Sequence, residues 1–399
     1  MGLPHVGMNA ISLLSPLTGV GQYTYHLSKA LVQAGADVSY FYGPVWSDRL
    51  LENEVDVRAE RDASSRLTPF TRKAMVGAKR LVKTVVPRPY EVVRFLQQRW
   101  FTRGLRSRSL DVYHDPNFIP FRFHGPTVIT VHDLSVLTLP HMHPSDRVRA
   151  IGGRLKWAVE QADAIITVSE FVREEVIESL GVPGEKVTAI HNGVDSAFRP
   201  RDASETAASL SRLGLRHARY VLGVGTLEPR KNLGRLCRAY RSLPEEVRQE
   251  FPLVLAGMKG WGESEFARDL EALIQEGNLV LPGYLESAAL RDLYAGAALF
   301  AYPSVYEGFG LPVVEAMASG VPVMTSNCSS LPEVAGDAAQ LVNPLEVDDI
   351  AAALARLLND SEERHCLATA GLKRASEYTW DITARKTLAV YDGVRSRGS

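Results

Sequence analysis

Short apolar runs alternate with helix-length amphipathic segments along most of this chain, and that alternation limits the fold it can adopt. In the second half the apolar runs are four to seven residues long. Runs of this kind, separated by helices, predict parallel strands joined by crossover helices. We expect strands at 220–225, 251–257, 279–284, 298–304 and 321–327, and helices at 233–243, 266–275, 288–295, 313–318 and 348–358.

The first half repeats the pattern around a helix expected at 22–34. A chain of 399 residues is long enough for two domains of ordinary size, and the polar, proline-containing stretch at 195–205 marks their boundary. We therefore predict an α/β protein with two Rossmann-like parallel-sheet domains facing across a cleft, which is the expected active site. The strands expected in this half are at 6–11, 37–43, 110–116, 126–133, 163–169 and 186–190.

Composition excludes several classes of protein. The chain is 45% hydrophobic and 23% charged, as soluble globular proteins are, and its net charge of −1 argues against a nucleic-acid partner. Its three cysteines, Cys237, Cys328 and Cys366, are far apart and lack CxxC spacing, which favours a reduced compartment. We recognise neither a secretory signal nor an apolar stretch of the roughly 18–20 residues that span a bilayer, so we expect a cytoplasmic location.

The small net charge conceals one strongly basic segment, residues 61–108. It holds thirteen Lys and Arg against two acidic residues, a local charge of +11, so the rest of the chain carries −12. Apolar side chains recur at helical spacing within 75–86 and 92–101, and the basic ones fall largely on other faces. This pattern is typical of a basic amphipathic helix at an anionic membrane surface. A solvated helical pair fits equally well, whereas no aromatic interleaving favours nucleic-acid binding.

Two glycines and a histidine follow early strands. Gly19 and Gly21 lie in the loop expected before the first helix, where the backbone can approach a ligand and free N–H groups can meet an anion. A third glycine of a dinucleotide fingerprint is missing, and a plain tight turn explains the pair as well. His132 ends a strand and so points into the cleft, where it can bind substrate hydroxyls or handle a proton. A turn capped by His132 and Asp133 is the alternative.

Adjacent cations follow the strand at 220–225. Arg230 offers a bidentate fork and Lys231 a point charge, and together they can clamp a diphosphate. The alternative is a pair of solvated loop charges. Elsewhere, His141 and His143 form an HxH pattern with no obvious third ligand, so we expect no metal site and assign these residues to a loop lining the acceptor cleft.

Two glutamates bracket seven residues in the segment YEGFGLPVVE. Glu307 lies in the loop before an expected helix and Glu315 lies within that helix. Carboxylates accept well from paired sugar or ribose hydroxyls. Between them, Gly308 and Gly310 expose backbone N–H groups where the helix begins, an arrangement that can hold hydroxyls or phosphate oxygens.

Taken together, these segments resemble the family 4 glycosyltransferases of the GT-B architecture and are most similar to bacterial mannosyltransferases of O-antigen assembly. The matching pieces run in the family's order from near residue 9 to near residue 340, and the closing YTWDITARKTLAVY resembles its last helices. The segment from Glu307 to Glu315 is the most specific. The pieces are GVGQY, VHD, TVSEF, HNGVD, GTLEPRKN, PGY, YPSVYEGFGLPVVEAMASGVPV and SSLPEVAGDAA.

The resemblance implies a nucleotide-sugar site built from both domains. It puts Gly19 and Gly21 near the donor phosphate and the transferred sugar, and His132 near the reacting carbon. Arg230 and Lys231 would hold the diphosphate. The other residues implied are the main chain of Gly283 and Tyr284 at the base, Glu307 with the backbone of Gly308, Phe309, Gly310 and Leu311 at the sugar and phosphate, and Glu315 at the ribose.

One position departs from the family pattern. Many relatives carry an arginine directly after the glycine of the segment GTLEPRKN, where this chain has Thr226, and we infer that Arg230 supplies the missing guanidinium. The domains implied are an acceptor-binding domain at 1–197, a nucleotide-sugar-binding domain at 198–378 and, at 379–399, a helix that returns to the first domain.

The resemblance also implies the reaction: a retaining hexosyl transfer without metal or cofactor, in which the leaving phosphate takes the acceptor's proton. GDP-mannose is the favoured donor, and a glycan or lipid-linked saccharide at the inner face of the plasma membrane is the favoured acceptor. One alternative is a soluble enzyme that uses a UDP-N-acetylhexosamine or a deoxysugar nucleotide on a small molecule. The other is a nucleotide-sugar-binding protein without turnover, which the intact set of site residues argues against.

Overall fold

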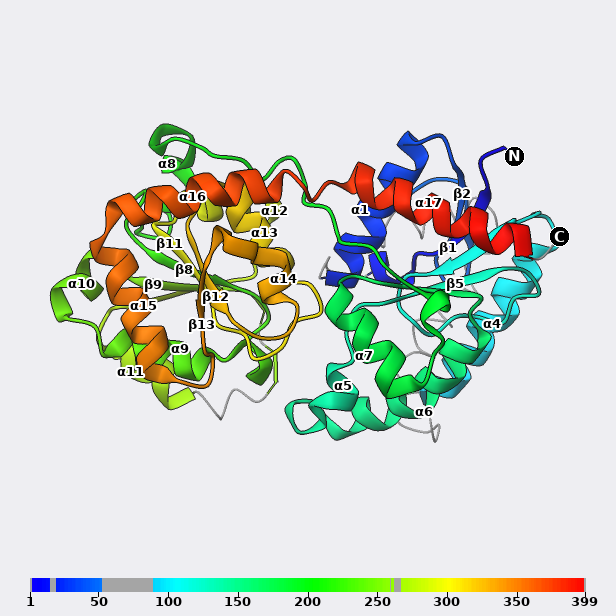
Figure 1. Ribbon diagram of the computed structural model, residues 1–399, viewed down its shortest axis with the longest axis horizontal. Helices are drawn as coiled ribbons and strands as arrows, with labels where there is room; N and C mark the ends of the chain where they lie inside the picture. Colours follow the sequence, from blue (N-terminus) through cyan, green and yellow to red (C-terminus); the bar gives the residue numbers. More distant parts are fainter. Residues whose placement is uncertain (1, 15–18, 52–88, 259, 262–266, 398–399) are drawn as a thin grey trace, which may run out of the picture.

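Two α/β domains lie side by side in the structure, each built on its own parallel sheet (Figure 1). The structure is a computed structural model, and it describes residues 2–14, 19–51, 89–258, 260–261 and 267–397.

The first sheet contains seven strands. They are β1 (His5–Asn9), β2 (Asp37–Phe41), β3 (Trp46–Ser47), β4 (Val112–Asp115), β5 (Thr127–Val131), β6 (Ala164–Thr167) and β7 (Val187–Ala189). Their order is β3-β2-β1-β4-β5-β6-β7. The order reverses at β1 and β4, so the ends of these strands form a topological switch point, where ligands bind in such sheets. Within this sheet β3 runs antiparallel to β2, and the other pairings are parallel.

The second sheet contains six strands. They are β8 (Val221–Val224), β9 (Leu253–Ala256), β10 (Leu279–Gly283), β11 (Leu299–Tyr302), β12 (Val323–Ser326) and β13 (Gln340–Val342). They lie in the order β10-β9-β8-β11-β12-β13, with every pairing among them parallel.

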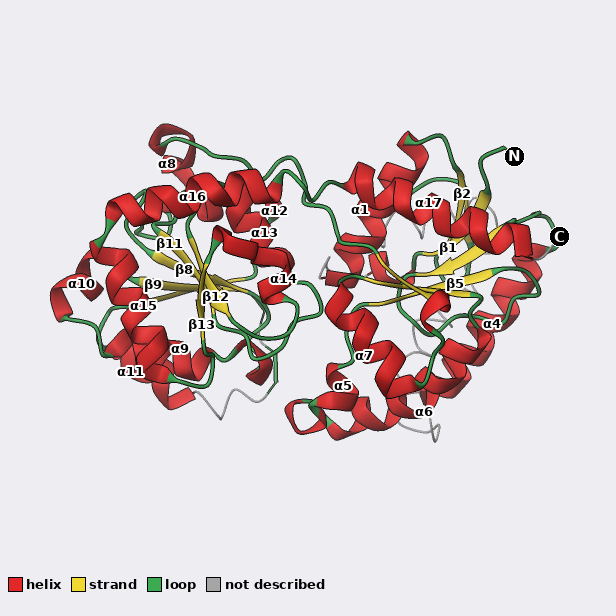
Figure 2. Cartoon of the chain, in the orientation of Figure 1, coloured by secondary structure: helices red, strands yellow, loops and turns green. Residues whose placement is uncertain are grey.

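Helices cover both sheets (Figure 2). The helices that lie between strands of the first sheet along the chain are α1 (Gly19–Gln33), α4 (Pro89–Leu105), α5 (Ser135–Thr138), α6 (Ser145–Gln161) and α7 (Glu170–Leu180). Those that follow are α8 (Ala203–Ser211), α9 (Leu233–Arg241), α10 (Glu245–Glu250), α11 (Ala267–Gln275), α12 (Ser287–Ala295), α13 (Leu311–Ala318), α14 (Leu331–Ala335), α15 (Val347–Asn359), α16 (Ser361–Ala375) and α17 (Trp380–Arg397).

The covered sheets explain why the strands read as continuous apolar runs. All five residues of β5 and all four of β11 are buried, as expected for parallel strands with helices over both faces. The predicted fold class is thereby confirmed.

Three local features differ from the sequence prediction. The strands β3 and β13, two and three residues long, are too short to leave a periodic signal. The helix α1 begins at Gly19 instead of residue 22, so Gly19 and Gly21 form its first turn and do not lie in a loop before it. Low helix propensity argued for a loop there, but buried residues of the helix, Gly21 among them, pack into the first domain.

The basic segment is only partly described. The helix expected at 75–86 lies outside the described residues, whereas the apolar positions at 92–101 belong to α4. Among the described helices, none is both long and apolar enough to cross a bilayer.

The last helix, α17, follows α16 of the second domain but lies over the first domain, against α1 (Figure 1). At its start the Trp380 ring stacks on His26, with ring centroids 5.4 Å apart. Farther along, the Tyr391 hydroxyl lies 2.6 Å from His114 Nδ1, and His114 Nε2 lies 2.8 Å from Thr130 Oγ1. Because burial lowers the pKa of His114 to about 3, its imidazole is neutral and relies on both hydrogen bonds.

We expect Tyr391→Phe to lower the free energy of unfolding by about 1–3 kcal/mol, because it leaves a buried ring nitrogen without its partner. Urea titration at neutral pH measures this loss. The control is Asp392→Asn on the exposed side of the same helix, which should change stability by no more than about 0.5 kcal/mol. Equal stabilities of the Tyr391→Phe and Asp392→Asn variants would show that the bond to His114 contributes nothing.

Candidate active site

The loop that follows β5 and the loop that follows β11 meet across the domain boundary. A Cβ atom built on Gly308 would lie 1.8 Å from the carbonyl oxygen of His132, so only glycine allows this approach. Leu134 N donates to the Tyr306 hydroxyl over 3.1 Å, and Ser169 Oγ donates to the carbonyl of Gly308 over 2.7 Å. Both loops follow carboxyl ends of strands, so the site lies where an α/β sheet is expected to bind ligands.

A buried carboxylate joins the predicted cations. Glu307 accepts from Arg230 Nη1 over 2.8 Å and from Lys231 Nζ over 2.7 Å, and the Tyr302 hydroxyl lies 3.0 Å from its Oε1. The three charged side chains are at most 14% exposed. The three predicted residues therefore form one buried ionic cluster, as charges of this kind must when they leave water.

A second carboxylate, that of Glu228, also binds Arg230. Its Oε1 accepts from Arg230 Nη2 over 2.7 Å and from Nε over 3.1 Å, while Nη1 also donates to the carbonyl of Tyr306 over 2.8 Å. The guanidinium is thus held between two domain-internal carboxylates and a carbonyl. It lies beside Lys231, and four of its five N–H donors are engaged, so it acts on a ligand mainly through its charge.

Charge in the cluster is fixed by these neighbours. Although burial acts to raise it, the pKa of Glu307 is held at about 2 by Arg230 and Lys231, so this carboxylate is ionised throughout the physiological range. Burial lowers the pKa of Lys231, while Glu307 opposes that shift. Burial acts to raise the pKa of Asp133, but chiefly the Arg230 charge keeps it below the usual value.

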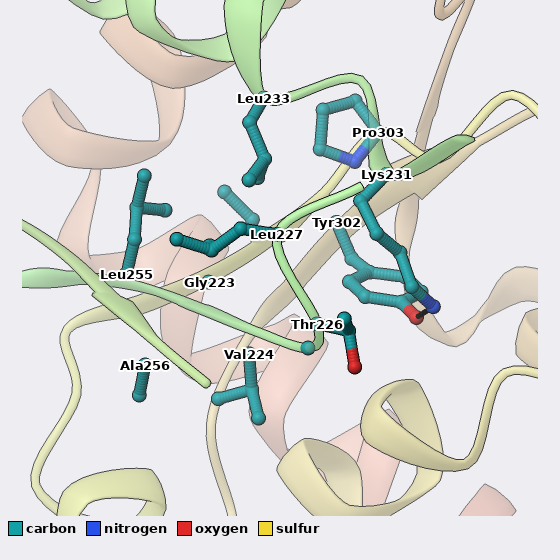
Figure 3. A pocket seen from close by; sticks show the side chains of 12 residues that line it. Gly223, Val224, Thr226, Leu227, Lys231, Leu233, Leu255, Ala256, Tyr302 and Pro303 are labelled. Carbon is teal, nitrogen blue, oxygen red and sulfur yellow. Dashed lines mark hydrogen bonds between the residues drawn. The ribbon is translucent and has the colours of Figure 1, made fainter. Parts of the chain in front are cut away.

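A small pocket opens beside Lys231 at the carboxyl ends of β8, β9 and β11 (Figure 3). Thr226 lines it in the turn after β8. Lys231 reaches along the pocket to the hydroxyl of Tyr302. The short Thr226 side chain leaves Lys231 as the cation that lines this pocket.

The helix α13 begins beside the ionic cluster. Its N-cap residue is Gly310, with a φ of 95° that favours glycine, and the ring of Phe309 is buried. Leu311 and Glu315 share a face of this helix and line a groove between α1 and the helices α12 and α13. Burial raises the pKa of Glu315 to about 7, so the carboxylate is poorly solvated before any ligand arrives.

The remaining predicted donor residues are more dispersed. Gly283 ends β10 with a φ of 71°, and Tyr284 after it is 55% exposed. Neither residue lines the groove, although Ser287 at the start of the neighbouring α12 does. Gly19 begins α1, whose Gln22 and His26 line the facing wall.

His132 is held in one tautomer. Its Nε2 lies 2.8 Å from the carbonyl oxygen of Pro116, which can only accept, so Nε2 carries the hydrogen. Burial lowers the pKa of His132, although the bond to Pro116 and the Asp133 charge oppose this shift. The ring is therefore neutral and its Nδ1 is a hydrogen-bond acceptor, suited to a substrate hydroxyl.

Sequence reasoning missed Glu228 and Tyr306, and it gave no role to Ser135. Glu228 stands two residues before Arg230, so an acidic residue within a cationic motif was the available signal.

Ser135 Oγ donates to Asp133 over 2.6 Å, which leaves its oxygen to accept from His143 Nε2 at 3.0 Å. His143 thus joins a polar chain to the site. Among the described residues, no cluster of three or more His, Cys, Asp or Glu side chains could hold a metal ion.

Comparisons with known proteins agree with this architecture. Residues 17–198 match the sequence model described as "Glycosyltransferase Family 4", and residues 213–374 match "Glycosyl transferases group 1". Sucrose-phosphate synthase from Thermosynechococcus elongatus has a TM-score of 0.73 at 19% identity, covering 99% of this chain and 100% of that one. WaaG, a glycosyltransferase involved in lipopolysaccharide biosynthesis, has a TM-score of 0.72 at 15% identity, covering 98% and 100%. The fold and the site therefore define a glycosyltransferase of the GT-B class.

Sequence similarity specifies the family. The chain is 36% identical over 381 residues to O-antigen chain mannosyltransferase B of Escherichia coli, which covers 94% of this chain and 96% of the relative. The chain belongs to glycosyltransferase family 4, as its motifs predicted.

The raised pKa of Glu315 predicts a pH-dependent effect of Glu315→Gln. Between about pH 4.5 and 7 the folded protein keeps a proton on Glu315 that the unfolded chain releases, so this group's contribution to stability falls as pH rises. Relative to wild type, Glu315→Gln should therefore melt a few degrees higher at pH 8 and at nearly the same temperature at pH 5. Calorimetry without nucleotide measures both. Glu245→Gln, on α10, is the control and should show no such pH dependence; an identical difference at both pH values for Glu315→Gln would refute the assignment.

Proposed function

We propose that this glycosyltransferase moves mannose from GDP-mannose to a glycan or lipid-linked saccharide in cell-surface polysaccharide synthesis, retaining the anomeric configuration and requiring no metal. The observation that carries the proposal is the buried pair of Lys231 and Arg230, joined by Glu307 at the start of α13 and opposed by His132 of the other domain. It offers two cations in fixed positions for a diphosphate, beside an acceptor for a sugar hydroxyl.

Mannose is supported by the relatives. Besides the O-antigen chain mannosyltransferase B, the serotype-specific mannosyltransferase WbdA of Escherichia coli is 35% identical over 232 residues. That alignment covers 57% of this chain and 28% of the relative. From the resemblance of the motifs we infer that guanine is the base of the donor nucleotide.

The reaction follows from the charges. The bond between the anomeric carbon and the phosphate oxygen breaks, and Lys231, the Arg230 charge and the amino end of α13 stabilise the leaving diphosphate. His132 Nδ1 accepts from a hydroxyl of the sugar. The acceptor oxygen forms the new bond on the face that the phosphate leaves, and its proton passes to the leaving phosphate oxygen. Glu307 keeps both cations in place and, with its pKa at about 2, takes no part in that proton transfer.

A panel of GDP-, UDP-, ADP- and dTDP-sugars tests the donor. We expect GDP-mannose to raise the melting temperature most, because a ligand that binds the folded state stabilises it. Lys231→Ala should abolish that shift and lower kcat/KM for GDP release by about 10²-fold or more. Lys373→Ala, an exposed cation on α16, is the matched control and should behave as wild type. A shift by a UDP-sugar instead would replace the donor, and binding without release of any nucleoside diphosphate would indicate a non-catalytic binding protein.

We also propose that α4 rests on an anionic membrane surface while the enzyme meets its acceptor. Its exposed apolar side chains are Val92, Val93, Phe95, Leu96 and Trp100, with Phe95 61% exposed. Exposed arginines accompany them on the same helix, and the Arg99 guanidinium lies 5.9 Å from the Phe95 ring centroid. Apolar side chains that enter the interface, flanked by cations that meet anionic headgroups, suit such a surface.

Flotation with vesicles tests this proposal. We expect the protein to float with phosphatidylglycerol vesicles at low salt and to be released by high salt, because screening weakens the arginine contacts. Phe95→Glu should prevent flotation at either salt concentration. Leu345→Glu replaces a similarly exposed apolar residue in the second domain and should float as wild type does. Absence of flotation by wild type at low salt would rule the membrane surface out.

A further inference from the structure

Three motifs of the family supply none of the predicted donor-site residues. They are TVSEF at 167–171, HNGVD at 191–195 and SSLPEVAGDAA at 329–339. In the structure, one residue from the third motif contacts the other two. We infer that Glu333 is a positioning residue, which clasps the second domain to the first and thereby holds the donor-binding loop against His132.

Glu333 lies on α14 in the second domain, and its carboxylate caps a helix of the first. Oε1 accepts from the backbone N of Glu170 over 2.9 Å, and Oε2 accepts from that of Phe171 over 3.1 Å. These are the first two N–H groups of α7, which have no partner within their own helix. A carboxylate at this end of a helix is stabilised by both the hydrogen bonds and the helix dipole.

The linker between the domains supplies the third contact. His191, just after β7, lies with Nε2 2.5 Å from Glu333 Oε1. Its ring packs against Phe309 of the donor loop, with centroids 5.9 Å apart, and its carbonyl accepts from Thr383 of α17 over 2.8 Å. We call Glu333, His191 and the N–H groups of Glu170 and Phe171 the Glu333 clasp.

The charge of Glu333 is maintained in this position. Burial acts to raise its pKa, but the bonds from His191 and from the two backbone N–H groups hold the pKa below its usual value. The side chain is still 23% exposed. A carboxylate at the rim of an interface can exchange these bonds for water when the domains separate, so the clasp can open without leaving a charge buried.

The helix α7 connects the Glu333 clasp to the active site. The N-cap residue of this helix is Ser169, whose hydroxyl accepts from Val172 N and donates to the carbonyl of Gly308. One turn farther on, Glu175 accepts from the Tyr306 hydroxyl. The same helix thus contacts the donor loop at two residues that flank Glu307, while Glu333 fixes its amino end to α14. Without the clasp we expect α7 and the loop to separate, and Gly308 to leave His132.

Two variants weaken the clasp from opposite sides. Glu333→Ala deletes the carboxylate. Glu170→Pro deletes one N–H donor from α7 and suits its place, because proline is favoured at the first position of a helix and Ser169 before it is extended. Glu170→Ala keeps the N–H and loses the same exposed side chain, with its ion pair to Arg173, so it is the matched control for the proline variant.

The primary measurement is the distance between the two domains, by spin-label spectroscopy without substrate. One label is on Cys366, which is exposed on α16, and the other on Ser107→Cys after α4, in a Cys328→Ser background. We expect Glu333→Ala and Glu170→Pro to broaden the distribution and move it to longer distances, with Glu170→Ala unchanged. Unaltered distances in both test variants would overturn the proposal, as would an equal change in Glu170→Ala. Glu170→Pro decides the matter if Glu333→Ala does not fold.

The second measurement is turnover, and it rests on the proposed donor. With GDP-mannose, we expect both test variants to lower kcat for GDP release about tenfold or more, while the donor KM changes less than about twofold, because most donor contacts lie within one domain. A purely structural role would lower the melting temperature without this division between kcat and KM. If no nucleotide sugar is turned over, the proposed function fails, and the distances alone still decide the clasp.

Discussion

The approach of Gly308 to the carbonyl of His132 is the constraint on which the rest of the site depends. A Cβ atom on Gly308 would lie 1.8 Å from that oxygen, so the two domains fit together only because this position has no side chain. The approach brings a neutral imidazole from one sheet beside an ionic cluster from the other. Neither domain alone contains both the ionic cluster and the neutral imidazole.

The ionic cluster shows how cations can be kept in a dry site. Glu307 neutralises Lys231, and Glu228 occupies the side of Arg230 that Glu307 does not reach. The charges are therefore preorganised, and a ligand would not have to order flexible lysine and arginine side chains. At Thr226 the pocket is lined by Lys231, and the Arg230 guanidinium is held outside the pocket lining by Glu228 and Glu307.

Much of this could be predicted from the sequence. The fold class and most elements follow from the spacing of apolar runs, and Glu307, Arg230 and Lys231 were named from motif and position. What could not be predicted depends on contacts between distant segments. The sequence around Glu228 does not show that Arg230 folds back and binds its carboxylate. The role of Glu333 depends on the fold, which brings the amino end of α7 against α14. Gly19 and Gly21 were expected in a loop because propensity is local, whereas packing decides where α1 begins.

The return of α17 means that the first domain is completed by the last segment of the chain. Arg395 Nη1 donates to the carbonyl of Gly2, so the two ends of the chain meet on that domain. In topological terms, the second domain is an insertion between β7 and α17. The segment that leads into it and the segment that leads out of it lie side by side, where Val194 forms a β-bridge with Thr379. A domain inserted in this way can be exchanged as a unit, with the first domain and its closing helix kept intact.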